Sequence, residues 1–192
     1  MENYFDFPIL DKAIRENYKK QEYQKVIFLD VDGVLHDYSH EDNNVQEEYV
    51  ARLKQIVDAT GADIILSSSW RMGYKEFLDA NHLEDVINEK EKAKLKLFHK
   101  YLYQYDLKLS GFTPYSMLGE NSRPLEIRAW LLDRPCTKSF VILDDEEFNW
   151  QWLRYFLVQT KRVVMDGDQP KHIYGLDDSH VMQAISILNY FG

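Results

Sequence analysis

Short apolar runs recur along the chain and predict buried strands. They lie at residues 25–29, 62–66, 106–112, 139–143 and 161–165, and most are rich in β-branched or aromatic residues. Runs of this length, bounded by polar turns, are typical of strands buried on both faces of a parallel sheet. The pattern therefore predicts a five-stranded sheet of the α/β class.

Apolar residues at helical spacing fill the intervals between these runs. Asn44 and Glu47 match a capping box at the start of one helix, and Gly61 predicts its end. Pro124 is suited to the first turn of a later helix. Strands that alternate with helices predict right-handed crossovers, which place the carboxyl ends of the strands on one edge of the sheet. The predicted helices cover residues 45–60, most of 72–105, 122–132, 148–159 and 179–190.

The length of 192 residues fits one domain with a substantial core. We expect residues 25–192 to form it, with residues 1–24 as a helical extension packed against it and a mostly helical insertion at about residues 72–121. The chain is 45% hydrophobic and 29% charged, as in ordinary globular proteins. No apolar run is long enough to cross a bilayer, and residues 1–10 lack a basic, apolar signal. We therefore expect a cytoplasmic protein without membrane contact.

Charge and cysteine content narrow the range of partners. The net charge of −9 argues against broad affinity for nucleic acids or anionic membranes. One predicted helix is locally basic, which is typical of a solvated face and is also compatible with steering a polyanion toward the site. The single cysteine, Cys136, cannot form an internal disulfide and is expected to pack in the interior. The basic stretch contains Lys90, Lys92, Lys94, Lys96 and Lys100.

Two acidic residues follow the first apolar run. Asp30 and Asp32 precede Gly33, which allows a sharp turn, and alternation along a strand would point both carboxylates to the same side. Two close carboxylates repel each other unless they share a cation such as Mg²⁺ or a proton. A solvated Asp-Gly turn is the plain alternative. An EF-hand is excluded because Val34 and Leu35 stand where it needs a ligand and a glycine.

Hydroxyl and basic residues follow the other predicted elements. Ser67 and Ser68 come directly after residues 62–66, and hydroxyls at a strand end suit phosphate oxygens, although a plain turn would also contain them. Arg123 opens a helix, where a guanidinium is unfavourable beside the helix dipole unless it faces an anion. An exposed surface arginine is the plain alternative. His36 and His40 lie in a polar loop, where histidines are usually solvated.

A second acidic strand end completes the pattern. Asp144 and Asp145 come directly after residues 139–143. Open α/β sheets bind ligands at the carboxyl ends of their strands, so these carboxylates should meet Asp30 and Asp32 at one edge. Acids in the later segment, Asp166 among them, are expected to be ordinary turn residues.

Taken as a set, these residues resemble the four motifs of the haloacid dehalogenase (HAD) superfamily, in the same order. The resemblance covers residues 26–188 and implies a Rossmann-like, doubly wound parallel sheet with helices on both faces and a minimal cap. Residues 66–71 and 123–131 resemble a branch with members associated with RNA repair. The third motif is often lysine in the superfamily, so Arg128 and Lys138 are further candidates for it. Asp30 and Asp32 match the first motif, Ser67 the second, Arg123 the third, and Asp144 with Asp145 the fourth.

The resemblance implies a phosphatase mechanism. Asp30 would attack phosphorus to give an aspartyl-phosphate, and Asp32 would act as general acid and then base, with its pKa raised by the neighbouring carboxylate. Mg²⁺ would be held by the carboxylates of Asp30 and Asp144, the main-chain carbonyl of Asp32, and Asp145 as a further ligand. The phosphoryl oxygens would be held by Ser67, Ser68 and Arg123.

Several activities remain compatible with these residues. An acid at Asp32 favours phosphoester hydrolysis over dehalogenation, whereas a phosphomutase would use the same set. Little chain separates Gly33 from Ala62, so no large lid fits there, and an open site favours a bulky or terminal phosphate, on a nucleic-acid end or a protein. A phosphatase of small metabolites or nucleotides is the first alternative. A HAD-fold binding module without turnover is the second, and a receiver-like switch fits the first motif poorly.

Overall fold

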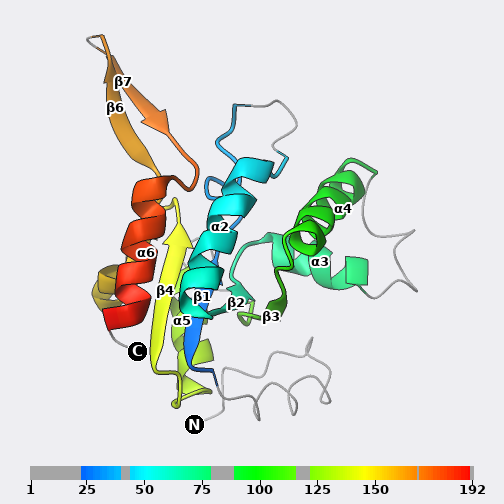
Figure 1. The fold of residues 1–192 in the computed structure, drawn as a ribbon, viewed down its shortest axis with the longest axis vertical. Helices are drawn as coiled ribbons and strands as arrows, with labels where there is room; N and C mark the ends of the chain where they lie inside the picture. The colour runs from blue at the N-terminus through cyan, green and yellow to red at the C-terminus, as the bar shows by residue number, and fades with distance from the viewer. Residues whose placement is uncertain (1–22, 40–43, 79–88, 116–121, 168, 191–192) are drawn as a thin grey trace.

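A parallel sheet forms the centre of the computed structural model (Figure 1), which describes residues 23–39, 44–78, 89–115, 122–167 and 169–190. The strand order is β3-β2-β1-β4-β5, and every neighbouring pair is parallel. The chain moves outward from β1 on one side and then from β4 on the other, so the predicted doubly wound sheet is confirmed. The strands are β1 (Lys25–Leu29), β2 (Asp63–Leu66), β3 (Leu109–Phe112), β4 (Ser139–Asp144) and β5 (Leu157–Gln159).

Helices cover both faces of this sheet. Alternation along the strands sends Leu29 and Leu143 toward α2, α4 and α6, whereas Phe28 and Ile142 face α5 and η1. Trp130 of α5 is buried against the second face, where its ring lies 5.1 Å from that of Phe28. The elements are α2 (Glu47–Thr60), α3 (Trp70–Leu78), α4 (Glu89–Gln104), α5 (Arg123–Leu132), the 3₁₀ helix η1 (Gln151–Phe156) and α6 (Asp178–Tyr190).

The boundaries of α2 and α5 agree closely with the sequence-based expectation, except at one cap. The N-cap of α2 is Gln46, whose side chain makes no capping hydrogen bond, so the predicted capping box of Asn44 and Glu47 is wrong. Gly61 ends the helix in the left-handed conformation, as predicted. Pro124 lies in the first turn of α5, and Arg123 is its first residue.

The prediction for residues 148–165 is wrong in two respects. The expected helix at 148–159 is only the short η1, followed directly by β5, which is the true fifth strand of the sheet. Most of the apolar run at 161–165 belongs to β6 (Arg162–Asp166), which forms a separate two-stranded antiparallel sheet with β7 (Gln169–Ile173). Three residues in β5 are too few to show a period, whereas the Val163-Val164-Met165 run imitates a core strand although it is exposed.

The β6-β7 hairpin projects from the carboxyl edge of the sheet (Figure 1). Its base is tied to the turn after β1, because the Gly33 carbonyl accepts hydrogen bonds from Thr160 Oγ1 at 2.7 Å and from the Gly175 amide at 2.8 Å. One face presents Val163 and Met165, which are 59% and 66% exposed. The sequence-based expectation of a minimal cap did not include this hairpin.

Other expectations concern residues away from the sheet. Cys136 is exposed, so the prediction that it packs in the interior is wrong. The predicted helical extension falls almost entirely on residues 1–22, outside the described residues, whereas Tyr23 is buried against Trp130. None of the helices in the described part of the chain is long and apolar enough to span a membrane.

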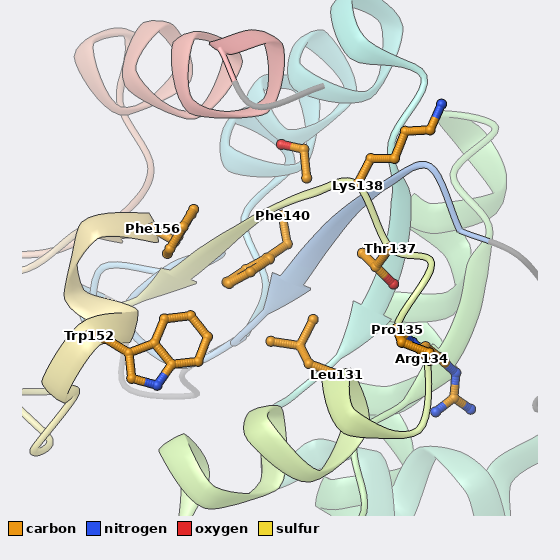
Figure 2. A pocket seen from close by; sticks show the side chains of 9 residues that line it. Leu131, Arg134, Pro135, Thr137, Lys138, Phe140, Trp152 and Phe156 are labelled. Carbon is orange, nitrogen blue, oxygen red and sulfur yellow. The ribbon is translucent and has the colours of Figure 1, made fainter.

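A cavity of about 240 Å³ lies at the amino end of β4. Figure 2 shows Phe140, Trp152 and Phe156 grouped along one part of its lining, with Leu131 nearby. Ser139 begins β4 beside this cavity, while Asp144 ends the same strand. The cavity is therefore at the opposite edge of the sheet from the acidic strand ends.

Candidate active site

The two acidic strand ends meet where the winding of the sheet reverses. β1 and β4 are neighbours, with Leu29 opposite Leu143, and the Asp30 amide donates to the Leu143 carbonyl at 3.0 Å. This register places Asp30 and Asp144 side by side at the carboxyl edge. That position is the usual ligand site of open α/β sheets.

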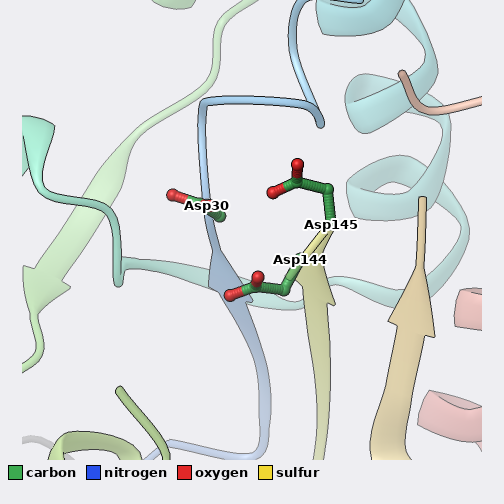
Figure 3. A group of neighbouring side chains, drawn as sticks. All are labelled: Asp30, Asp144 and Asp145. Carbon is green, nitrogen blue, oxygen red and sulfur yellow. The ribbon is translucent and has the colours of Figure 1, made fainter. Parts of the chain in front are cut away.

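Three carboxylates gather at this edge. One oxygen from each of Asp30, Asp144 and Asp145 lies within 4.8 Å of the others, and Figure 3 shows the three side chains around a common space. All three residues are at least 97% buried. Buried carboxylates at this separation require a cation, or protons, between them.

Gly33 allows the close approach of Asp145 to the first turn. Its φ is +67°, and a Cβ at this position would lie only 2.3 Å from the carboxyl carbon of Asp145. Any other residue would therefore displace Asp145 as well as strain the turn. The Asp-x-Asp-Gly motif thus uses its glycine to bring an acid of β4 against the end of β1.

Arg123 supplies one positive charge to the three carboxylates. Its Nη1 lies 2.6 Å from Asp30 Oδ2 and 2.7 Å from Asp144 Oδ2. Burial alone would lower the pKa of this guanidinium, but the charges of Asp30 and Asp144 outweigh that effect and raise it. Arg123 therefore stays charged and bridges the first and fourth motifs.

One arginine does not neutralise all three acids. Burial and the charge of Asp30 raise the pKa of Asp144 to about 8 and that of Asp145 to about 7. Burial also raises the pKa of Asp30, although Arg123 and a hydrogen bond from Ser68 oppose this. Asp30 Oδ1 is buried without a hydrogen-bond partner among the described residues. The excess negative charge and the unpaired oxygen fit a hard divalent cation bound by oxygen ligands.

Asp32 lies in a different environment, although it is only two residues from Asp30. Its Oδ1 is 2.9 Å from Nε2 of His36, and the indole Nε1 of Trp70 donates to Oδ1 and Oδ2 at 3.1 and 3.0 Å. Burial raises the pKa of Asp32, but the hydrogen bonds from His36 and Trp70 and the charge of Lys94 outweigh it, so the pKa lies below its ordinary value.

Two sequence-based expectations about Asp32 need correction. β1 ends at Leu29, so strand alternation does not extend to Asp32, and its carboxylate is not one of the clustered three. The expected rise of its pKa is wrong for this state of the protein, because two donors hold the ionised form. A contribution of its main-chain carbonyl to a metal site stays a prediction.

The loop after β2 brings hydroxyls to the same edge. Ser67 and Ser68 are almost fully buried, and the Ser67 hydroxyl has no hydrogen-bond partner among the described residues. Thr113, which follows the neighbouring strand β3, carries another buried hydroxyl without a partner there. A buried unpaired hydroxyl is costly in an isolated fold, and a ligand that fills its hydrogen-bonding capacity would remove this cost.

A buried ion pair holds this loop against α5. Arg71 donates to the carbonyls of Ser67 and Ser68 at 3.1 and 2.6 Å and to Glu126 Oε2 at 2.7 Å. Both side chains of this pair are at least 95% buried. Glu126 lies one turn after Arg123 in α5, so the pair fixes the serine loop relative to the arginine.

With this geometry established, comparison with known proteins identifies the family. A model described as the HAD domain in Swiss Army Knife RNA repair proteins matches residues 26–166, well over half of the chain. The chain belongs to this family. No curated protein and no solved structure matches it significantly. Membership supports a phosphatase-type hydrolase in general, and HAD domains generally use a divalent metal.

The structure of this HAD domain brings most of the expected residues to one edge. Arg123 reaches the carboxylates, whereas Arg128 is exposed on α5 and Lys138 is exposed at the amino end of β4. His36 was expected to be solvated, but it is 1% exposed and bonded to Asp32. His40 lies outside the described residues.

Sequence reasoning did not assign roles to four residues of the HAD domain. Trp70, Arg71 and Glu126 lie in the stretches that carried the resemblance. Their contacts, an indole hydrogen bond to Asp32 and an ion pair between α3 and α5, join distant segments and leave no periodic signal in the sequence. Thr113 looked like an ordinary loop residue. Their position could have indicated a role at the site, because Thr113, Trp70 and Arg71 all closely follow the carboxyl ends of strands.

Proposed function

We propose that this HAD domain is a Mg²⁺-dependent phosphomonoesterase that works through an aspartyl-phosphate on Asp30. The observation that carries the proposal is the buried cluster of Asp30, Asp144 and Asp145 with Arg123 at the switch point of the sheet. The unpaired Asp30 Oδ1 and the raised pKa values of the other two acids support a bound divalent cation. Mg²⁺ there would neutralise charge between the carboxylates and a phosphate anion.

In the first step a carboxylate oxygen of Asp30 attacks phosphorus. The bond between phosphorus and the ester oxygen breaks, and that oxygen takes a proton from Asp32 and leaves as an alcohol. Asp32 is ionised in the structure, so it must first gain a proton. An approaching phosphate dianion favours this, because a nearby like charge raises the pKa of a carboxyl group.

In the second step a water molecule attacks phosphorus of the aspartyl-phosphate. Asp32 accepts a proton from this water, the bond between phosphorus and the Asp30 oxygen breaks, and inorganic phosphate leaves. His36 and Trp70 hold the Asp32 carboxylate in place through both steps. Arg123 and the hydroxyls of Ser67 and Ser68 bind the phosphoryl oxygens, whose charge is redistributed in the transition state.

The substrate we propose is a terminal phosphate on a nucleic acid. The matched family is named for RNA repair proteins, and the partly exposed Asp32 side chain gives a bulky leaving group access. The helix α4 contributes a basic surface at Lys90, Lys92, Lys94, Lys96 and Lys100, to which we assign contact with the strand.

Phosphate release from a panel of phosphoesters tests the proposal. The panel contains sugar phosphates, nucleotides, 3′- and 5′-phosphorylated oligonucleotides and phosphopeptides, each with Mg²⁺ or with a chelator. We expect the highest kcat/KM for the oligonucleotides, and loss of turnover both with chelator and in Asp30→Asn. Asp133→Asn, an exposed carboxylate at the end of α5, is the matched control and should retain activity. Turnover that persists in Asp30→Asn would remove Asp30 as the nucleophile.

A further inference from the structure

The open side of Asp32 carries several side chains that the proposed chemistry leaves unused. The Asp32 side chain is 37% exposed, whereas the three clustered acids are buried. Asp32 is the group that protonates the leaving oxygen in the proposed reaction. The residues around its exposed side therefore face the leaving group rather than the transferred phosphoryl group.

Tyr38 is an exposed aromatic residue near Asp32, against whose partner His36 it packs. Its ring is 42% exposed, and it makes edge contacts with His36 at 4.6 Å and Tyr174 at 4.8 Å. Its φ of +60° lies in the left-handed region, which is rare for a bulky residue. Tyr174 follows β7 directly, so the base of the hairpin supports the ring.

The Tyr38 hydroxyl lies within electrostatic reach of the acids. Burial and the charges of Asp145, Asp32 and Asp30 raise its pKa, so the hydroxyl stays protonated. The ring is therefore a neutral aromatic surface beside the site. An exposed aromatic ring that packs against two other rings next to a phosphoester site suits stacking with a flat group of the substrate.

Lys94 also lies near Asp32, beside Trp70. Its Nζ is 5.8 Å from the centre of the Trp70 ring, and Trp70 itself donates to Asp32. The Lys94 side chain is only 15% exposed, and its ion pair with Glu91 is long, at 3.9 Å. Lys90, Lys96 and Lys100 on the same helix are exposed. Lys94 is thus a lysine turned from α4 toward the catalytic edge.

We propose that Tyr38 and Lys94 form a leaving-group subsite for the terminal nucleotide of a phosphorylated RNA strand, with the base on the Tyr38 ring and the adjoining phosphodiester at Lys94. The inference rests on the proposed function of the same site. Tyr38 suits a flat uncharged ring and Lys94 suits a second anion, and a terminal nucleotide in a strand carries both close to its end phosphate. Phosphoserine and phosphothreonine peptides lack the flat ring.

Binding to an inactive protein tests the subsite separately from turnover. The probe is a short, end-phosphorylated oligoribonucleotide, and the comparison is the same strand with an abasic terminal nucleotide. Binding of both strands to Asp30→Asn in the presence of Mg²⁺ is measured by fluorescence anisotropy. Stacking of one base on an aromatic ring predicts that Tyr38→Ala weakens binding of the base-bearing strand roughly 5- to 100-fold. In this variant the base-bearing and the abasic strand should bind with nearly equal affinity. Tyr38→Phe keeps the ring and should preserve the preference for the base-bearing strand.

Two further variants guard against effects on folding. Tyr38→Asn suits the positive φ better than alanine and should lose the base preference equally. Tyr103→Ala removes a tyrosine that is 85% exposed on α4 and should leave both affinities unchanged. A base preference that survives in Tyr38→Ala and Tyr38→Asn would overturn the stacking role, and tighter binding of a phosphotyrosine peptide would overturn the nucleotide assignment.

The salt dependence of the same binding tests Lys94. Loss of one phosphate contact on a single strand should reduce the slope of log K against log salt by about 0.7 in Lys94→Ala. Lys108→Ala, an exposed lysine before β3 at the opposite edge, should leave the slope unchanged. An unchanged slope in Lys94→Ala would remove Lys94 from the subsite. Failure of the wild type to hydrolyse any phosphoester would instead overturn the proposed function, and the binding data would still decide the subsite.

Discussion

Asp30 and Asp32 are two residues apart, yet the structure places their carboxylates in opposite electrostatic situations. Asp30 is buried with Asp144 and Asp145, and Arg123 is the cation that contacts two of them. Asp32 is partly exposed and accepts hydrogen bonds from His36 and Trp70. Burial therefore raises the pKa of Asp30, whereas the donors lower that of Asp32.

This difference separates the two tasks that the motif must perform. A carboxylate in a buried acidic cluster is neutralised by a metal and can then serve as a nucleophile and ligand. A carboxylate that is accessible and held by hydrogen-bond donors can exchange protons with a leaving group and with water. The environment divides these roles, because the two side chains are chemically identical.

The largest expected effect follows from removal of the Arg123 charge. In chelator, Arg123→Met leaves Asp30 and Asp144 buried without their shared partner, which should lower the free energy of unfolding by about 3–5 kcal/mol. Mg²⁺ should restore more stability to this variant than to the wild type, because both cations neutralise the same carboxylates. Urea unfolding with and without Mg²⁺ measures both quantities.

Arg128→Met is the matched control for this experiment, since Arg128 is exposed on the same helix. Its stability should change by less than about 0.5 kcal/mol and its response to Mg²⁺ should be that of the wild type. If Arg123→Met lowers the free energy of unfolding equally with and without Mg²⁺, the arginine and the metal do not neutralise the same carboxylates.

The pH dependence of stability should have opposite signs for the acidic cluster and for Asp37, whose pKa is lowered. Asp144 and Asp145 have folded pKa values of about 8 and about 7, above the unfolded value near 4. In chelator the folded state then binds more protons than the unfolded state between about pH 4 and pH 8. Stability should therefore fall as pH rises through this interval, and Mg²⁺ should remove the fall.

Asp37 provides the opposite slope within the same protein. Burial raises its pKa, but hydrogen bonds from Ser39, Gln46 and Tyr49 together outweigh this and lower it to about 2. Its stabilising contribution is present above about pH 4 and is lost as pH falls toward 2. Urea midpoints across pH 2–9 measure both slopes, and Asp37→Asn should flatten only the acidic one. A flat profile between pH 5 and 8 in chelator would contradict the raised pKa values.

Gly33→Ala should disturb the acidic cluster more than it disturbs Asp32. The positive φ alone costs about 1–2 kcal/mol for alanine, and the added Cβ would also displace the Asp145 carboxylate. Weaker Mg²⁺ binding by isothermal titration calorimetry is the expected result. Gly61→Ala has the same positive φ but open space around it, so it should lose similar stability and keep its Mg²⁺ affinity.

The sequence predicted that Asp30 and Asp144 would meet, because their meeting depends on strand order alone. Asp30 and Asp144 follow strongly apolar runs, and a doubly wound sheet places the ends of adjacent parallel strands together. Arg123 was recognisable for a related reason, since a cation at a helix N-terminus is unfavourable without an anion beside it. These inferences needed only the order of elements and the direction of each strand.

The sequence was less informative wherever side chains from different segments determine the result. The donors to Asp32 come from a loop and from α3, so the direction of its pKa shift could not be read from the spacing to Asp30. Strand β5 was missed because three residues show no period, and the exposed run in β6 was mistaken for it. Which of the two segments joins the central sheet depends on tertiary pairing, and local apolar content does not determine this pairing.

The smallest predicted effect tests the Asp32 side of the comparison directly. Trp70→Phe keeps an aromatic ring but removes the indole N–H that donates to the carboxylate at 3.0 Å. The pKa of Asp32 should rise toward its ordinary value, because a hydrogen bond to the ionised form is lost. Titration of the Asp32 carboxyl carbon by NMR measures this, with Trp152→Phe beside the remote cavity as the control. An unchanged pKa would mean that His36 alone holds Asp32 ionised, and a fall would contradict the hydrogen-bond origin of the shift.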